Sequence, residues 1–182
     1  LPYERLSDDK QPLFYIFNYI VLFLSKSNYL FYKIFFDIFT FANAIIIFLI
    51  VYRRNNQTIF IGITSSSVYL FVSSQPWANS EYSEIMSLTF LGLSYFLTTH
   101  LKFSKYRYLF SGIFFSISTL INIGTGIFSI GFLILFLLKK QEFLFSKIFY
   151  FSLGFIPIHL SILFLYALNG LTLIYTTTLI TI

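Results

Sequence analysis

The chain has 182 residues, of which 57% are hydrophobic and 10% are charged, whereas soluble domains average about 45–50% apolar and about 25% charged residues. Aromatic residues make up 23% of the chain, and one water-solvated core of this size could not bury so much apolar surface. The lack of cysteine excludes disulfide scaffolds and thiolate metal sites. The net charge of +5 falls in short clusters between apolar runs, which indicates a polytopic membrane protein and no nucleic-acid partner.

Apolar runs of two lengths follow one another along the chain. A membrane-spanning helix needs about 20 apolar residues, and shorter runs are more often interfacial. The short run 12–24 starts at a proline, which suits a first helical turn, and predicts a helix lying on the membrane surface. The remaining runs predict spans at residues 34–52, 58–74, 85–99, 108–121, 125–138 and 148–168.

A polar break interrupts the apolar stretch between residues 108 and 138. Asn122, Gly124 and Gly126 lie at its middle, and a Gly-containing polar break of this kind predicts a hairpin turn between two helices. Two polar side chains inside expected spans, Asn43 and His159, are expected to form hydrogen bonds between helices. An intramembrane histidine is also a functional candidate by default.

The orientation follows from the basic residues, because loops rich in Lys and Arg stay cytoplasmic. Arg53 and Arg54, residues 102–107 and residues 139–147 are strongly basic and fall in alternate loops. The opposite side, which includes Glu81 and Glu84, has a net negative charge and is predicted to be external. This assignment holds only if the helix 12–24 does not cross the membrane.

Two polar clusters meet on the predicted external face, at residues 8–15 (DDKQPLFY) and 75–84 (QPWANSEYSE). With the spacing of the helices, they resemble the GT-C glycosyltransferases of the protein O-mannosyltransferase and aminoarabinose-transferase type. In that family a lysine, two prolines, a leucine and aromatic residues end the first large external loop. Here Lys10 opens the corresponding segment, which departs from the family pattern at Gln11.

The order of later features carries the rest of the resemblance, which covers roughly residues 8–140. A surface helix is followed by a basic residue opening a span, here near Lys33, and by a span ending in paired arginines, here Arg53 and Arg54. An external acidic residue, here Glu84 or Glu81, opens a following helix, and a hairpin of two short helices comes next.

The resemblance implies an all-α, polytopic membrane bundle of the GT-C type. Residues 1–182 would form part of one transmembrane domain, with the end of an external loop and a surface helix at 1–33 and the spans at 34–182. Because the chain begins at Leu1 and ends within an apolar run, we expect an internal piece truncated at both ends and inactive alone. The expected location is a prokaryotic plasma (inner) membrane.

The implied activity is transfer of a sugar from a polyprenyl-phosphate donor to a lipid, glycan or protein acceptor on the external face. In the family the catalytic Asp lies early in the first external loop. Asp8 and Asp9 are too close to Lys10 to match that position, so we expect this Asp upstream of the chain. A rival hypothesis is a non-catalytic membrane subunit or a transporter fragment, in which the Asn122 break would be a substrate-binding discontinuity near mid-membrane.

Each candidate site residue has a functional and a purely structural interpretation. Lys10 pairs with the donor phosphate or is a solvated loop lysine. Glu84 and Glu81 have a catalytic role, with Glu84 also a candidate ligand for a divalent metal ion, or they simply favour a helix start. Trp77 contacts the substrate from the external loop or belongs to the interfacial aromatic belt.

Overall fold

The computed structural model describes residues 12–26, 28–54, 58–74, 82–100, 106–127, 131 and 144–168. The regular secondary structure of these segments is helical, which confirms the all-α fold class for the described part of the chain. The elements are α1 (Pro12–Leu24), α2 (Tyr29–Arg54), α3 (Ile59–Ser73), α4 (Tyr82–His100), α5 (Tyr106–Ile121), the 3₁₀ turn η2 (Ile123–Ile127) and α7 (Leu144–Leu168).

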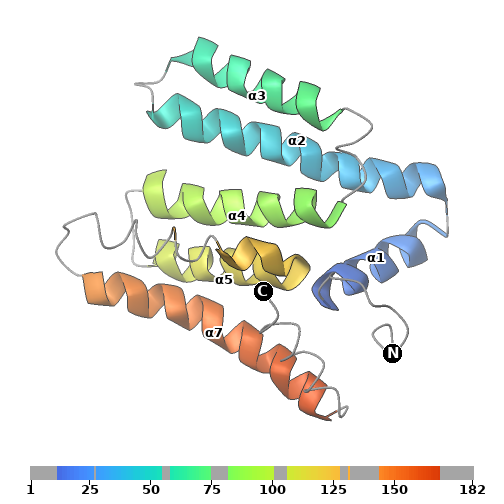
Figure 1. The fold of residues 1–182 in the computed structure, drawn as a ribbon, viewed down its shortest axis with the longest axis vertical. Helices are drawn as coiled ribbons and strands as arrows, with labels where there is room; N and C mark the ends of the chain where they lie inside the picture. The colour runs from blue at the N-terminus through green and yellow to red at the C-terminus, as the bar shows by residue number, and fades with distance from the viewer. Residues whose placement is uncertain are drawn as a thin grey trace.

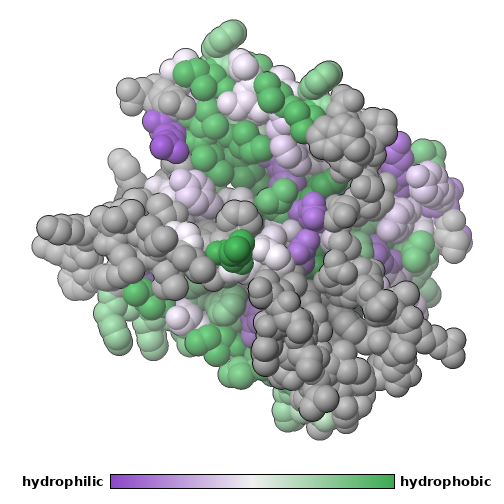
Figure 2. Space-filling view, in the orientation of Figure 1, coloured by the Kyte–Doolittle hydropathy of each residue, from purple (hydrophilic) through white to green (hydrophobic). Residues whose placement is uncertain are grey.

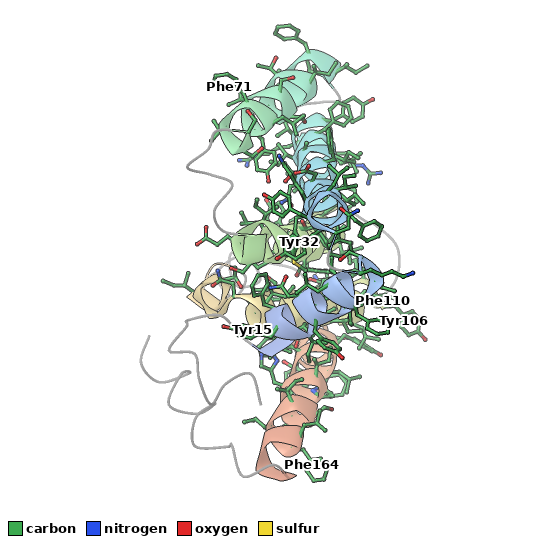
Figure 3. All side chains as sticks on the ribbon, turned by 90° about the vertical axis from the view of Figure 1, so that its right-hand side faces the viewer. Tyr15, Tyr32, Phe71, Tyr106, Phe110 and Phe164 are labelled. Carbon is green, nitrogen blue, oxygen red and sulfur yellow. The ribbon has the colours of Figure 1, made fainter. Side chains whose placement is uncertain are left out.

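The long helices pack side by side in a single row in the order α3, α2, α4, α5 and α7 (Figures 1 and 3). The helix α1 lies obliquely beside the start of α2, and it contacts α5 and α2. Successive helices from α2 to α5 run in alternating directions. The buried residues therefore lie along the seams between helices rather than in one central volume.

Most helix boundaries fall within a few residues of those predicted. The helix α1 has the predicted bounds, and α5 ends at Ile121, followed by the predicted break as η2. In contrast, α2 begins at Tyr29, five residues before the expected start at residue 34. Asn28 explains the difference, since its Oδ1 accepts a hydrogen bond from Leu30 N at 2.9 Å and caps the helix. The predicted span 125–138 lies mostly outside the described residues.

Two of the described helices are long and apolar enough to cross a membrane, namely residues Tyr29–Arg54 and Phe145–Leu165. The helices α1 and α3 are apolar but shorter. The expected spans at 85–99 and 108–121 correspond to α4, which is more polar, and to α5, which has 16 residues. Serine and threonine account for much of this polarity.

The helices expose many large apolar side chains, and they bury serine and threonine side chains beside apolar ones. Large apolar residues on the outer faces are highly exposed, such as Phe71 at 70% and Phe145 at 84%, and hydrophobic residues cover much of the described surface in Figure 2. The seam between α4 and α5 instead contains Ser94 and Ser111, whose hydroxyl oxygens lie 2.7 Å apart. This distribution is typical of helices that are solvated by lipid, where small polar residues pack between helices.

Asn43 joins three helices near the middle of the row. Its Nδ2 donates to Tyr69 Oη on α3 at 3.0 Å and to the carbonyl oxygen of Ile85 on α4 at 2.9 Å. The side chain is buried, so both bonds replace hydrogen bonds to water. The expected interhelical role of Asn43 is confirmed.

Along the helix axes the row has two ends, at which the helices begin or finish. Basic and acidic residues lie at opposite ends in this sense. Arg53 and Arg54 end α2 beside the end of α4, where the Arg53 guanidinium carbon lies 5.2 Å from the centroid of the Phe96 ring. Because α5 runs antiparallel to α4, Arg107 lies at this same end (Figure 1). Glu84, in the first turn of α4, lies at the opposite end.

This separation makes the predicted orientation testable by cysteine labelling, because the chain has no native cysteine. In the full-length protein, a Glu81→Cys variant should react with a membrane-impermeant maleimide added to intact cells. An Arg54→Cys variant should react only after the membrane is permeabilised. Labelling of position 81 from the cytoplasmic side alone would contradict the orientation.

Candidate functional site

A pocket of about 230 Å³ lies where the beginning of α4 meets the turn η2. This feature, called the Glu84 pocket below, is lined by Glu84, Ser87, Leu88, Asn122, Gly124 and Thr125. Residues from two segments about 40 positions apart in sequence thus form one site. The start of α4 lies opposite to the end of α2 and the start of α5 (Figure 1), so the pocket is remote from Arg53 and Arg107, which belong to those two helix ends.

Hydrogen bonds give the turn wall of the pocket its shape. Asn122 Oδ1 accepts from the backbone N–H of Gly124 at 2.9 Å, and Thr125 Oγ1 donates to the carbonyl oxygen of Asn122 at 2.6 Å. Ser118 Oγ on α5 lies 2.8 Å from the carbonyl oxygen of Ser87 and 3.2 Å from Thr125 Oγ1. These contacts tie the turn to both α5 and α4.

A buried hydrophobic cluster supports the pocket from the side of α2. Phe36 is fully buried and packs with Met86 and Ile121. Phe14 and Phe17 of α1 lie against the same cluster. Met86 follows Glu84 by two positions and Ile121 precedes Asn122, so this packing holds the two walls of the pocket against each other.

The chemistry of the lining is acidic and hydrogen-bonding. Glu84 is the one charged residue among the described residues of the lining, and Ser87 donates to the Glu84 carbonyl oxygen at 3.0 Å. The bond from Gly124 N to Asn122 Oδ1 orients the amide of Asn122. Within the described part of the chain, Asn122 Nδ2 has no hydrogen-bond acceptor. The pocket therefore offers a carboxylate as acceptor and an amide N–H as donor.

The structure places only some of the predicted site residues. Glu84 lines the pocket, whereas Lys10, Trp77 and Glu81 lie outside the described residues, so their meeting with Glu84 stays a prediction. Sequence reasoning treated Asn122 only as part of a hairpin turn or a transporter break. Its position after a helix that runs antiparallel to α4 is the signal that could have placed it beside Glu84.

His159 lies apart from this pocket, in the seam between α5 and α7. Its Nδ1 is 2.8 Å from Ser116 Oγ and its Nε2 is 3.1 Å from Thr119 Oγ1. The ring also packs on Phe155, with the ring centroids 4.3 Å apart. Both ring nitrogens of His159, which belongs to α7, thus have hydroxyl partners on α5, which confirms the expected interhelical hydrogen bonding.

Metal-binding residues are sparse in the described segments. No group of three or more His, Cys, Asp or Glu side chains that could hold a metal ion occurs among those residues. At the pocket, Glu84 supplies one carboxylate, with hydroxyl and amide groups beside it. Such oxygen donors suit a hard cation like Mg²⁺, which commonly binds to one or two carboxylates and keeps several waters.

Comparisons with protein families, curated proteins and solved structures give no match to this chain. The assignment of a function therefore depends on the pattern of the sequence and on the geometry of the pocket. Fold alone would not suffice in any case, because function depends on a site rather than on an architecture.

Proposed function

We propose that the chain is part of a GT-C glycosyltransferase in a prokaryotic plasma (inner) membrane. The enzyme transfers a sugar from a polyprenyl-phosphate donor to a lipid, glycan or protein acceptor on the external face. One observation carries the proposal: the carboxylate-bearing Glu84 pocket opens at one end of a helical row whose outer surface is apolar. A lipid-linked substrate needs both a lipid-facing surface and a polar site near the headgroups.

The reaction needs two kinds of protein group. The acceptor hydroxyl attacks the anomeric carbon of the sugar, the bond from that carbon to the phosphate oxygen breaks, and the lipid phosphate leaves. A carboxylate accepts or orients the hydroxyl proton. A cation stabilises the charge of the leaving phosphate. We assign Glu84, with Glu81 near it, to the first group and Lys10 to the second, while the main catalytic Asp is expected upstream and Trp77 in the substrate loop.

A divalent metal ion would fit the same proposal as the partner of the leaving phosphate. Glu84 would be its protein ligand, because it supplies the carboxylate among the described residues of the lining. The metal would supply electrostatic stabilisation of the phosphate oxygens. Loss of transfer on chelation and its recovery with added Mg²⁺ would support this role.

The position of the polar break favours the enzyme over the transporter. In a transporter, a discontinuous helix carries the binding site near the middle of the membrane. Here Asn122 and η2 come after the end of α5, at the same end of the row as the start of α4 (Figure 1). A break at a helix end, which would lie near the headgroups if α5 crosses the membrane, suits a reaction at the membrane surface.

Substitution of the two proposed site residues tests the function. In the full-length protein, Glu84→Gln and Lys10→Ala should each lower transfer from a polyprenyl-phosphate sugar by more than about tenfold, since a charge-assisted hydrogen bond contributes roughly 1.5–3 kcal/mol. Arg54→Ala, at the opposite end of the row, should leave turnover nearly unchanged. Wild-type rates in both site variants, with their folding intact, would place the active site elsewhere.

A further inference from the structure

We infer that the basic end of the helix row binds the headgroups of anionic phospholipids. The basic end is where α2 and α4 finish and where α5 and α7 begin (Figure 1), and it is predicted to face the cytoplasm. Its cations on the described helices are Arg53 and Arg54 of α2, Arg107 of α5 and Lys147 of α7. Lipid binding there is independent of the proposed glycosyl transfer, which concerns the opposite end.

Helix packing brings two of these cations to the same end of one seam. Residues 109–116 of α5 face residues 151–159 of α7 in the same order along the chain, so the two helices run parallel. Arg107 is the second residue of α5 and Lys147 is the fourth residue of α7. Both cations therefore lie at adjacent helix starts.

The charge balance of the basic end is strongly positive along the whole sequence. Residues 53–54, 102–107 and 139–147 contain eight basic residues and one acidic residue, Glu142. Glu142 can therefore offset only a small part of the positive charge. An anionic leaflet attracts such a cluster, and each Lys or Arg near its surface strengthens binding about fivefold.

The stability of the individual helices does not explain all of these cations. Arg53 and Arg54 end α2, where the helix dipole favours positive charge. Arg107 and Lys147 instead lie near the starts of α5 and α7, where the dipole disfavours positive charge. A negatively charged partner outside the helices would offset this cost.

The surroundings of the cations favour a lipid over a soluble anion. Tyr106, beside Arg107, is 55% exposed and extends outward from α5 (Figure 3). Phe145, two residues before Lys147, is 84% exposed. A phospholipid presents a phosphate joined to acyl chains, so its headgroup can contact the cations while its chains cover these rings. A soluble phosphate would leave the rings exposed to water.

Aromatic rings already orient two of the arginines. The guanidinium carbon of Arg53 lies 5.2 Å from the centroid of the Phe96 ring. That of Arg107 lies 4.6 Å from the centroid of the Tyr108 ring, and Arg107 Nη2 donates to Tyr108 Oη at 2.7 Å. A guanidinium that is held in place before a phosphate arrives loses less conformational entropy on binding.

Native mass spectrometry of the full-length protein in detergent measures the lipid preference. The probes are dioleoyl phosphatidylglycerol, which is anionic, and dioleoyl phosphatidylcholine, which has the same acyl chains and a neutral headgroup. We expect phosphatidylglycerol to bind at least about tenfold more tightly, as for two or more cations near the headgroup. Inorganic phosphate at matched ionic strength should not displace it.

Charge variants locate the binding at the basic end. Arg54→Gln and Lys147→Gln should each lower the association constant for phosphatidylglycerol about fivefold, and the double variant about 25-fold, because independent contributions add as free energies. Arg54→Lys keeps the charge and should bind as the wild type does. Lys33→Gln removes an exposed cation from the first part of α2 and is the matched control, with unchanged binding.

Three results would each overturn the inference: equal affinity for the two lipids, displacement of phosphatidylglycerol by inorganic phosphate, or an equal loss of binding in Lys33→Gln and Arg54→Gln. Displacement by phosphate would identify a soluble anion as the ligand of the basic end. Sugar transfer does not enter these measurements, so a failure of the proposed glycosyltransferase function would leave their outcome unchanged.

Discussion

Replacement of Gly154 by valine is expected to force α7 away from α5 and to lower the free energy of unfolding by about 3 kcal/mol or more, at the upper end of the range for overpacked sites. A Cβ atom at Gly154 would overlap the carbonyl oxygen of Leu109. A Cβ atom at Gly112 would likewise overlap the carbonyl oxygen of Phe151. The two backbones approach each other through these two glycines, and neither carbonyl can swing aside as a side chain could.

Thermal unfolding of the full-length protein in detergent measures this effect. Gly112→Val should be as harmful as Gly154→Val, because each glycine faces the backbone of the other helix. Gly126→Ala is the control, since its Cβ would lie 3.8 Å from Thr119 Cγ2, an ordinary contact. Equal melting temperatures for Gly154→Val and Gly126→Ala would show that α5 and α7 do not pack in this way.

Replacement of Phe36 by alanine is expected to cost about 3–5 kcal/mol of stability, as for other large buried aromatic residues. The side chain is 0% exposed and fills the space between Met86, Ile121 and α1. Its loss would leave a cavity beneath both walls of the Glu84 pocket. Stability and transfer activity should therefore fall together.

A second phenylalanine of the same helix provides the matched control. Phe41 is 60% exposed on the outer face of α2, so Phe41→Ala removes the same atoms without creating a cavity between helices. Its unfolding temperature and transfer activity should stay close to those of the wild type. A larger loss of stability for Phe41→Ala than for Phe36→Ala would contradict the packing of α2.

Local sequence features account for the helices and their ends. The apolar runs predict where helices form, since hydrophobic content is a property of each segment by itself. The break after Ile121 is predictable for the same reason, because Asn122, Gly124 and Gly126 disfavour continuation of the helix. The cap at Asn28 also has a local signal, namely an asparagine directly before an apolar run.

Lateral packing is not encoded in such local features. Hydropathy alone leaves open which helices are neighbours, because lipid solvates any apolar face equally well. The order of the row depends on shape, as at Gly112 and Gly154, and on particular hydrogen bonds, as from Asn43 to α3 and α4. Both require knowledge of two surfaces at once.

The sequence by itself therefore determined that the described chain is helical, that its outer surface is apolar and that basic and acidic residues alternate between helix ends. Only the tertiary structure decided that Glu84 and Asn122 line one pocket and that His159 is held by Ser116 and Thr119. The physical reason is range: helix formation and partition into lipid depend on neighbouring residues, whereas these contacts join residues about 40 positions apart that meet only when α4, α5 and α7 pack side by side.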